Sequence, residues 1–153
     1  MSKANEQIII LLVEDDPGHA RLIEKNLRRA DIANEILVFG NGQQVMDYLE
    51  GIKQHTPNMP HERLLMFLDL NMPVLDGYQV LQRVKADART QHIPVVILTT
   101  TDDAIEIERC YALGANAYVT KPVDYAQFAE AIHKIGLFLT VVKIPGTNEK
   151  WKM

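Results

Sequence analysis

Cysteine is nearly absent from this sequence, since Cys110 is its only one, and no disulfide can form within the chain. This is compatible with a reducing, cytoplasmic location, and Cys110 itself is expected to be a small buried side chain. An excess of basic residues is also missing, because 16 Lys and Arg are outweighed by 20 Asp and Glu. Binding to nucleic acid or to an anionic membrane is therefore not expected. Long apolar runs are missing as well: the run at residues 8–13 is too short for a signal peptide or a transmembrane span.

The remaining composition is that of one ordinary globular domain of 153 residues, 47% of them hydrophobic. Short apolar runs alternate with amphipathic segments, which is typical of parallel strands joined by crossover helices. The sequence therefore predicts an α/β fold, a doubly wound parallel sheet of five strands flanked by five helices. The expected strands are 8–13, 35–39, 64–68, 94–98 and 117–120, and the expected helices are 19–30, 45–51, 77–85, 103–113 and 124–139.

Residues 52–63 have no periodicity and are expected to form a long loop before the third strand. Its two histidines, His55 and His61, have no cysteine or nearby acid to complete a metal site, so a metal site there is not favoured. Asp76 and Asp102 are the expected N-caps of the third and fourth helices, because each stands just before a helical pattern.

The third predicted strand is a continuous apolar run that ends at Asp69, as expected of a strand buried on both faces. By itself, Asp69 would be interpreted as a turn or capping residue. Other predicted strands also end in polar residues, namely Glu14, Asp15 and Asp16 after the first, Thr99 after the fourth and Lys121 after the fifth. Because the carboxyl ends of parallel strands share one edge of the sheet, these side chains are expected to converge.

These residue types together favour phosphoryl chemistry. Two or three carboxylates without a cysteine suit a hard cation, and Mg²⁺ binds one or two carboxylates together with phosphate oxygens. A lysine and a hydroxyl at the same edge are suited to the oxygens of a phosphoryl group. Asp69 is then the natural nucleophile, because carboxylates can form aspartyl phosphates.

The ordered set of residues 14–17, 69–77, Thr99 and 120–122 resembles the motifs of response-regulator receiver domains in two-component signalling. The spacing is similar to that family's pattern, because Thr99 follows Asp69 by 30 residues (99 − 69) and Lys121 follows it by 52 (121 − 69). The resemblance implies a flavodoxin-like sheet with strand order 2-1-3-4-5. It also implies a receiver domain over residues 7–140 and a C-terminal extension over 141–153, with no separate output domain.

The resemblance further implies that Asp69 is the phosphorylation site, which accepts a phosphoryl group from a sensor histidine kinase. Mg²⁺ would be bound by Asp15, Asp69 and the backbone carbonyl of Asn71, with Glu14 acting through a water molecule. Asp16 is left open between loop chemistry and support of the metal.

For catalysis and switching, the resemblance implies that Thr99 and Lys121 contact the phosphoryl oxygens and act with Asp69 as catalytic residues. Pro122 would follow a cis peptide bond. Thr99 and Tyr118 would form the switch, in which the aromatic ring moves inward as the hydroxyl moves toward the phosphoryl group. An ordinary packing role for Tyr118 stays open.

The implied function is that of a single-domain response regulator, which is not an enzyme except that it catalyses its own phosphorylation and dephosphorylation. Its output surface would be the fourth helix, fifth strand and fifth helix, where Ile107 and Tyr111 form either an exposed apolar strip or part of the core. This surface and the C-terminal extension would form a homodimer and contact an unknown downstream protein. The loop 52–63 and the ending 138–145 resemble the small cyanobacterial regulators that partner phytochrome kinases.

Other function classes agree less well with these residues. A Rossmann dinucleotide site needs glycines after the first strand, where acids stand. A haloacid-dehalogenase-type phosphatase also uses an aspartyl phosphate, but it needs a second aspartate at the position that Asn71 occupies. A pseudo-receiver, a binding module that is never phosphorylated, stays open, although the acids and Lys121 argue against it.

Overall fold

The computed structural model describes residues 8–55, 64–72, 75–100, 103–121 and 124–134. Within these residues it has a five-stranded, all-parallel sheet in the order β2-β1-β3-β4-β5. The strands are β1 (Ile9–Val13), β2 (Ile36–Phe39), β3 (Leu64–Asp69), β4 (Val95–Thr99) and β5 (Ala117–Thr120). The predicted α/β fold class and strand order are therefore confirmed.

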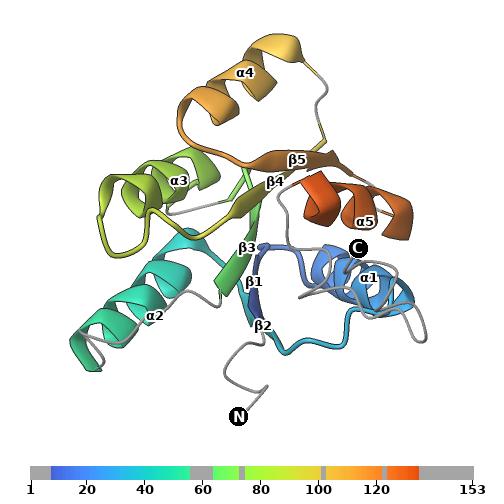
Figure 1. Ribbon diagram of the computed structural model, residues 1–153, viewed down its shortest axis with the longest axis horizontal. Coiled ribbons are helices and arrows are strands. Elements are labelled where there is room, and N and C mark those ends of the chain that lie inside the picture. The colour runs from blue at the N-terminus through green and yellow to red at the C-terminus, as the bar shows by residue number, and fades with distance from the viewer. Residues whose placement is uncertain (1–7, 56–63, 73–74, 101–102, 122–123, 135–153) are drawn as a thin grey trace, which may run out of the picture.

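Five helices within the described residues cover the two faces of the sheet (Figure 1). They are α1 (Pro17–Arg29), α2 (Gly42–His55), α3 (Gly77–Ala86), α4 (Ala104–Ala112) and α5 (Tyr125–Lys134). One hydrophobic cluster joins the sheet to α1 and α5, and a second joins it to α2, α3 and Cys110 of α4. The sheet is thus enclosed on both sides, which explains why every residue of β3 is buried.

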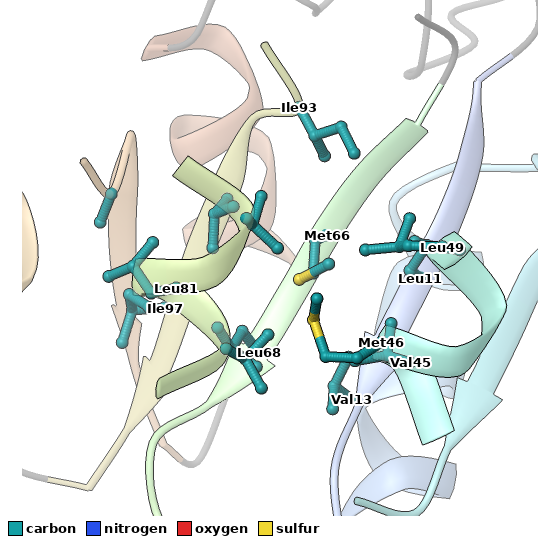
Figure 2. Close-up of a cluster of buried hydrophobic side chains, with 14 of the residues drawn as sticks. Leu11, Val13, Val45, Met46, Leu49, Met66, Leu68, Leu81, Ile93 and Ile97 are labelled. Atoms are coloured by element: carbon teal, nitrogen blue, oxygen red, sulfur yellow. The ribbon is translucent and has the colours of Figure 1, made fainter. Parts of the chain in front are cut away.

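The two clusters anchor β3 from opposite sides. On the side of α2 and α3, Met46 from α2 and Met66 from β3 lie in the middle of the cluster (Figure 2). On the side of α1 and α5, Phe67 packs edge to face against Phe128, with ring centroids 5.0 Å apart. Since interiors of this kind are densely packed, the strand that ends in Asp69 forms a rigid support for that carboxylate.

Helix α2 is longer than the sequence pattern predicts, because it continues to His55 although a loop is expected from residue 52. Ile52 packs against the second cluster. Partial burial of this side chain favours continuation of the helix through Gly51, although glycine costs about 1 kcal/mol relative to alanine within a helix. The rest of the predicted loop, residues 56–63, lies outside the described residues.

The helix ends also test the predicted caps. Asp76 is the N-cap of α3, as predicted, and forms a capping box with Gln79. For α4 the prediction is wrong by one residue: the N-cap is Asp103, whose carboxylate accepts a hydrogen bond from the backbone N–H of Ile105 at 2.9 Å. The expected continuation of α5 to residue 139 and the C-terminal extension lie outside the described residues. None of the described helices is both long and apolar enough to cross a membrane.

Candidate functional site

The register of the sheet brings two of the predicted acids together. Val13 pairs with Leu68, so the next residues, Glu14 and Asp69, follow at the same level on adjoining strands. Both are almost fully buried, with 2% and 4% of their surface exposed, while Asp15 is exposed. Each of the three acids offers a ligand oxygen that lies within 4.8 Å of the others. Hard oxygen donors in this arrangement suit a divalent cation such as Mg²⁺.

Lys121 reaches this acidic cluster from the end of β5. Its Nζ atom lies 2.5 Å from Oε1 of Glu14 and 3.4 Å from Oδ2 of Asp69. The backbone N–H of Lys121 donates a hydrogen bond to the carbonyl of Thr99 at 2.7 Å, which ties the residue to the end of β4. The ammonium group therefore compensates the two buried carboxylates, and its closer partner is Glu14.

The two carboxylate oxygens of Glu14 are each engaged by a different group. Oε1 pairs with Lys121, and Oε2 accepts a hydrogen bond from the backbone N–H of Asp16 at 3.2 Å. His19 also approaches Oε2, with its Nδ1 atom 3.8 Å away. Because both of its carboxylate oxygens already have partners, Glu14 agrees better with a role through a water molecule than with a role as a direct metal ligand.

The environment of Asp69 raises the pKa of its carboxyl group in the absence of a cation. Burial is the main cause, and the nearby charge of Glu14 adds to it, so that the pKa of Asp69 rises from 3.8 to about 6. The Lys121 ammonium and the backbone N–H of Asn71 act in the opposite direction. A divalent cation at the cluster would compete with this proton, because it interacts favourably with the ionised carboxylate alone.

The described residues that follow β3 lie close to the Asp69 carboxylate and to one another. The backbone N–H of Asn71 donates a hydrogen bond to Oδ1 of Asp69 at 3.3 Å. Gly77, the first residue of α3, donates its N–H to the carbonyl of Leu70 at 3.0 Å. A Cβ atom at Gly77 would lie only 2.6 Å from Leu70 Cα, so glycine is required by this close approach. The metal-binding role of the Asn71 carbonyl stays a prediction.

Thr99 and Tyr118 line one small hollow between the sheet and α4. Thr99 is buried at the end of β4. Tyr118 is half-buried, and its ring packs edge to face against that of Tyr111, with centroids 6.2 Å apart. The hollow is too narrow to hold a water molecule and is also lined by Glu106 and Cys110. The two residues of the predicted switch are thus brought together, and their movement stays a prediction.

Asp16, which the sequence left open, serves as the N-cap of α1. Its Oδ1 atom accepts hydrogen bonds from the backbone N–H groups of Gly18 at 2.8 Å and His19 at 3.1 Å. The His19 N–H is the main cause of the lowered pKa of Asp16. Pro17 occupies the first position of α1, and an aspartate directly before such a proline is the sequence signal that indicates an N-cap. Asp16 is not part of the three-acid cluster among the described residues.

The remaining residues that the sequence singled out lie outside the acidic cluster or outside the described residues. Pro122, His61 and the side chain of His55 lie outside the described residues. On α4, Ile107 and Tyr111 are half-buried and do not form an open strip, and the large apolar side chain that this helix exposes is Ile105, with 74% of its surface exposed. Cys110 is buried, as predicted.

Comparisons with known proteins agree with this geometry. A family model described as the response regulator receiver domain matches residues 10–133. Response regulator Rcp1 of Synechocystis is 32% identical over 94% of this chain and 97% of its own length. Its Mn²⁺-bound structure has a TM-score of 0.66 to this chain, is 30% identical and covers 91% of this chain and 99% of its own.

Two further solved structures are similar over most of the chain. A response regulator receiver domain from Rhodospirillum rubrum is 50% identical, with a TM-score of 0.72 and coverage of 90% of this chain and 97% of its own. The phosphorylated cyanobacterial phytochrome response regulator RcpA is 30% identical, with a TM-score of 0.69 and coverage of 92% and 99%. The resemblance that the sequence motifs indicate is therefore confirmed by whole-chain similarity.

Proposed function

The chain belongs to the response regulator receiver family, and from this we propose that it accepts a phosphoryl group on Asp69 from the phosphohistidine of a sensor histidine kinase. The observation that carries this proposal is the buried carboxylate of Asp69, clustered with Glu14 and Asp15 and lying 3.4 Å from the Lys121 ammonium. An acid in such a setting is a candidate nucleophile for phosphoryl transfer.

In the proposed reaction an ionised carboxylate oxygen of Asp69 attacks the phosphorus atom of the donor. The new O–P bond forms while the P–N bond breaks, and the imidazole of the kinase leaves with the electron pair. The Lys121 ammonium would donate hydrogen bonds to the phosphoryl oxygens, because it already contacts both Glu14 and Asp69. The hydroxyl of Thr99, at the end of the neighbouring strand, would donate a further hydrogen bond there.

The three acids fit a bound Mg²⁺, which would supply positive charge beside the phosphoryl oxygens as they gain charge. We expect Asp15, Asp69 and the Asn71 carbonyl to hold the ion, with Glu14 acting through water. The engagement of both Glu14 oxygens by Lys121 and the Asp16 N–H supports this division of roles. The Mn²⁺-bound form of the relative Rcp1 supports a divalent cation in this family.

The phosphoryl group adds a charge of about −1.5 to −2 at the edge of the sheet. Thr99 and Lys121 would close on it, and the ring of Tyr118 would move into the hollow beside Thr99. The proposed output surface is α4, β5 and α5, which would contact a downstream protein and a second copy of the chain as a homodimer. In this proposal the chain catalyses only its own phosphorylation and dephosphorylation, and the cytoplasmic location stays a prediction.

Labelling with acetyl phosphate tests the proposed site. In the presence of Mg²⁺ the wild-type protein should gain a phosphoryl group, detected as a mass increase, and Asp69→Asn should not. Labelling of the Asp69→Asn variant at the wild-type rate would refute the assignment of Asp69. A wild-type protein that binds Mg²⁺ but is never labelled would instead favour the pseudo-receiver.

A phytochrome-class histidine kinase is the proposed partner, supported by the similarity to the phytochrome response regulator RcpA over 92% of this chain. Phosphotransfer from a panel of purified kinases checks this. The phytochrome kinases should transfer to the chain faster than kinases with other sensor domains. Equal or faster transfer from unrelated kinases would contradict the partner and leave the assignment of Asp69 unaffected.

A further inference from the structure

Helix α4 is held to the rest of the protein by few buried side chains. Within α4, all of whose residues are described, only Cys110 is buried. The helix lies beside β5 at the top of Figure 1. In an element with so little buried apolar surface, a few polar contacts carry a large share of its attachment.

One side chain of α3 contacts α4 at two points. The hydroxyl of Tyr78 donates a hydrogen bond to Oε1 of Glu106. The guanidinium of Arg109 lies over the ring of the same tyrosine, 3.9 Å from its centroid. Glu106 and Arg109 are three residues apart and therefore lie on one face of the helix. We call Tyr78, Glu106 and Arg109 the α3–α4 clasp.

The clasp borders the space that the proposed switch needs. Glu106 lines the hollow that Thr99 and Tyr118 share. Its walls stand too close together to admit a water molecule, and Tyr118 forms part of the wall, with its ring packed against that of Tyr111. The ring can therefore enter only when α4 moves relative to the sheet, and such a movement strains or breaks the contacts of Tyr78.

The clasp also lies next to the acceptor loop. Tyr78 follows Gly77, whose N–H is bound to the carbonyl of Leu70, and Leu70 directly follows Asp69. One end of the clasp is thus attached to the backbone that supports the acceptor, and the other end to the helix that limits the movement of Tyr118.

We infer that the α3–α4 clasp holds α4 in its resting position and sets the fraction of molecules in which the ring of Tyr118 can enter the hollow beside Thr99. Tyr78 is then a positioning residue, which acts through α4. The inference rests on the proposed function. By linkage, weakening the clasp raises the population of the conformation that the phosphoryl group favours. We take that conformation to be the one that also reacts faster with the donor, so weakening the clasp is expected to raise the rate of phosphorylation.

The first test compares labelling rates in Tyr78→Phe, Glu106→Ala and the double variant, with acetyl phosphate and saturating Mg²⁺. Phenylalanine keeps the ring beneath Arg109 and removes only the hydroxyl. Loss of one partly buried hydrogen bond should raise the maximal rate about three- to tenfold, with the half-saturating donor concentration unchanged. The double variant should resemble either single variant, because both remove the same contact.

Glu108→Ala is the matched control, since Glu108 is an exposed acid of the same helix outside the clasp. It should react at the wild-type rate. Wild-type rates in Tyr78→Phe and Glu106→Ala, or the same change in Glu108→Ala, would overturn the inference. Thermal unfolding of each variant separates these effects from a loss of folded protein.

A second readout does not depend on phosphorylation and so separates this inference from the proposed function. NMR spectra of the Mg²⁺-loaded protein with isotope-labelled tyrosine rings report the environment of Tyr118. In Tyr78→Phe the chemical shift of the Tyr118 ring should move toward the value expected for a ring inside the hollow, and in Glu108→Ala it should stay unchanged. An unmoved Tyr118 resonance in Tyr78→Phe would refute the clasp even if Asp69 is phosphorylated normally.

Discussion

The ammonium of Lys121 lies 2.5 Å from Oε1 of Glu14, although 107 residues separate the two in the chain. Each of these side chains is nearly buried, with 11% and 1% exposed. A buried charge is costly unless it is paired, so the Lys121 ammonium offsets part of the cost of burying the Glu14 carboxylate next to Asp69. The lysine is thus held near the acceptor by a neighbouring acid.

Replacement of Glu14 tests this relationship through the pKa of Asp69. Glu14→Gln removes the negative charge next to Asp69. Of the two acids that contact Lys121, only Asp69 then remains charged. Both effects lower the pKa of Asp69 below about 6. Carboxylate titration by NMR in metal-free buffer measures the pKa. Glu24→Gln removes the same charge from α1 and should leave it unchanged. A pKa of Asp69 that stays at its wild-type value in Glu14→Gln would contradict the proposed interaction.

Asp69 should make the stability of the metal-free protein depend on pH. Its pKa is raised to about 6 by burial and Glu14, so the native state holds the proton more tightly than the unfolded chain. The unfolding free energy therefore falls as pH rises from about 4 through about 6. Asp69→Asn should be more stable than wild type above this range, by about 3 kcal/mol at most, and similar to it near pH 4.

Urea denaturation of wild type and Asp69→Asn with a chelator, at about pH 4.5 and about pH 7.5, measures this difference. Added Mg²⁺ should stabilise wild type more than Asp69→Asn at the higher pH, because the variant lacks one of the three carboxylates. A stability difference that stays constant between the two pH values would argue against a raised pKa of Asp69.

The neighbouring acids Asp15 and Asp16 should differ in their effect on metal binding. Asp15 belongs to the three-acid cluster, so Asp15→Asn should weaken Mg²⁺ binding about tenfold or more. Asp16 caps α1, and asparagine is an equally good N-cap, so Asp16→Asn should bind Mg²⁺ nearly as wild type does. Calorimetric titration compares them. Equal weakening in both variants would indicate that Asp16 also holds the ion.

Two glycines should respond in opposite ways to alanine. At Gly77 a Cβ atom would collide with the backbone of Leu70, so Gly77→Ala should lower the unfolding free energy by about 1–3 kcal/mol. It should also slow phosphorylation, because it displaces the loop beside Asp69. At Gly51 nothing lies within 4 Å, so Gly51→Ala should stabilise α2 by about 0.5–1 kcal/mol. Urea denaturation checks both, and a neutral Gly77→Ala would mean that the loop yields easily.

The fold and the location of the site could be predicted because both follow from local patterns. Short continuous apolar runs specify buried parallel strands, and the residues that end these runs must meet at one edge. Asp69, Thr99 and Lys121 were accessible to this reasoning. The end of α2 and the N-cap of α4 could not be predicted in this way. The helix continues to His55 because Ile52 packs against the core, and the choice between two successive aspartates as N-cap depends on the backbone conformation at Asp103.

The sequence by itself determined the alternation of strands and helices, the acids at the strand ends and the spacing of Thr99 and Lys121 from Asp69. These features depend on residue type and order along the chain. The tertiary structure alone decided that Lys121 pairs with Glu14 and that Tyr78 reaches Glu106 and Arg109. Such contacts join segments far apart in sequence, and they depend on the packing of helices on the sheet and on side-chain rotamers, which no local pattern encodes.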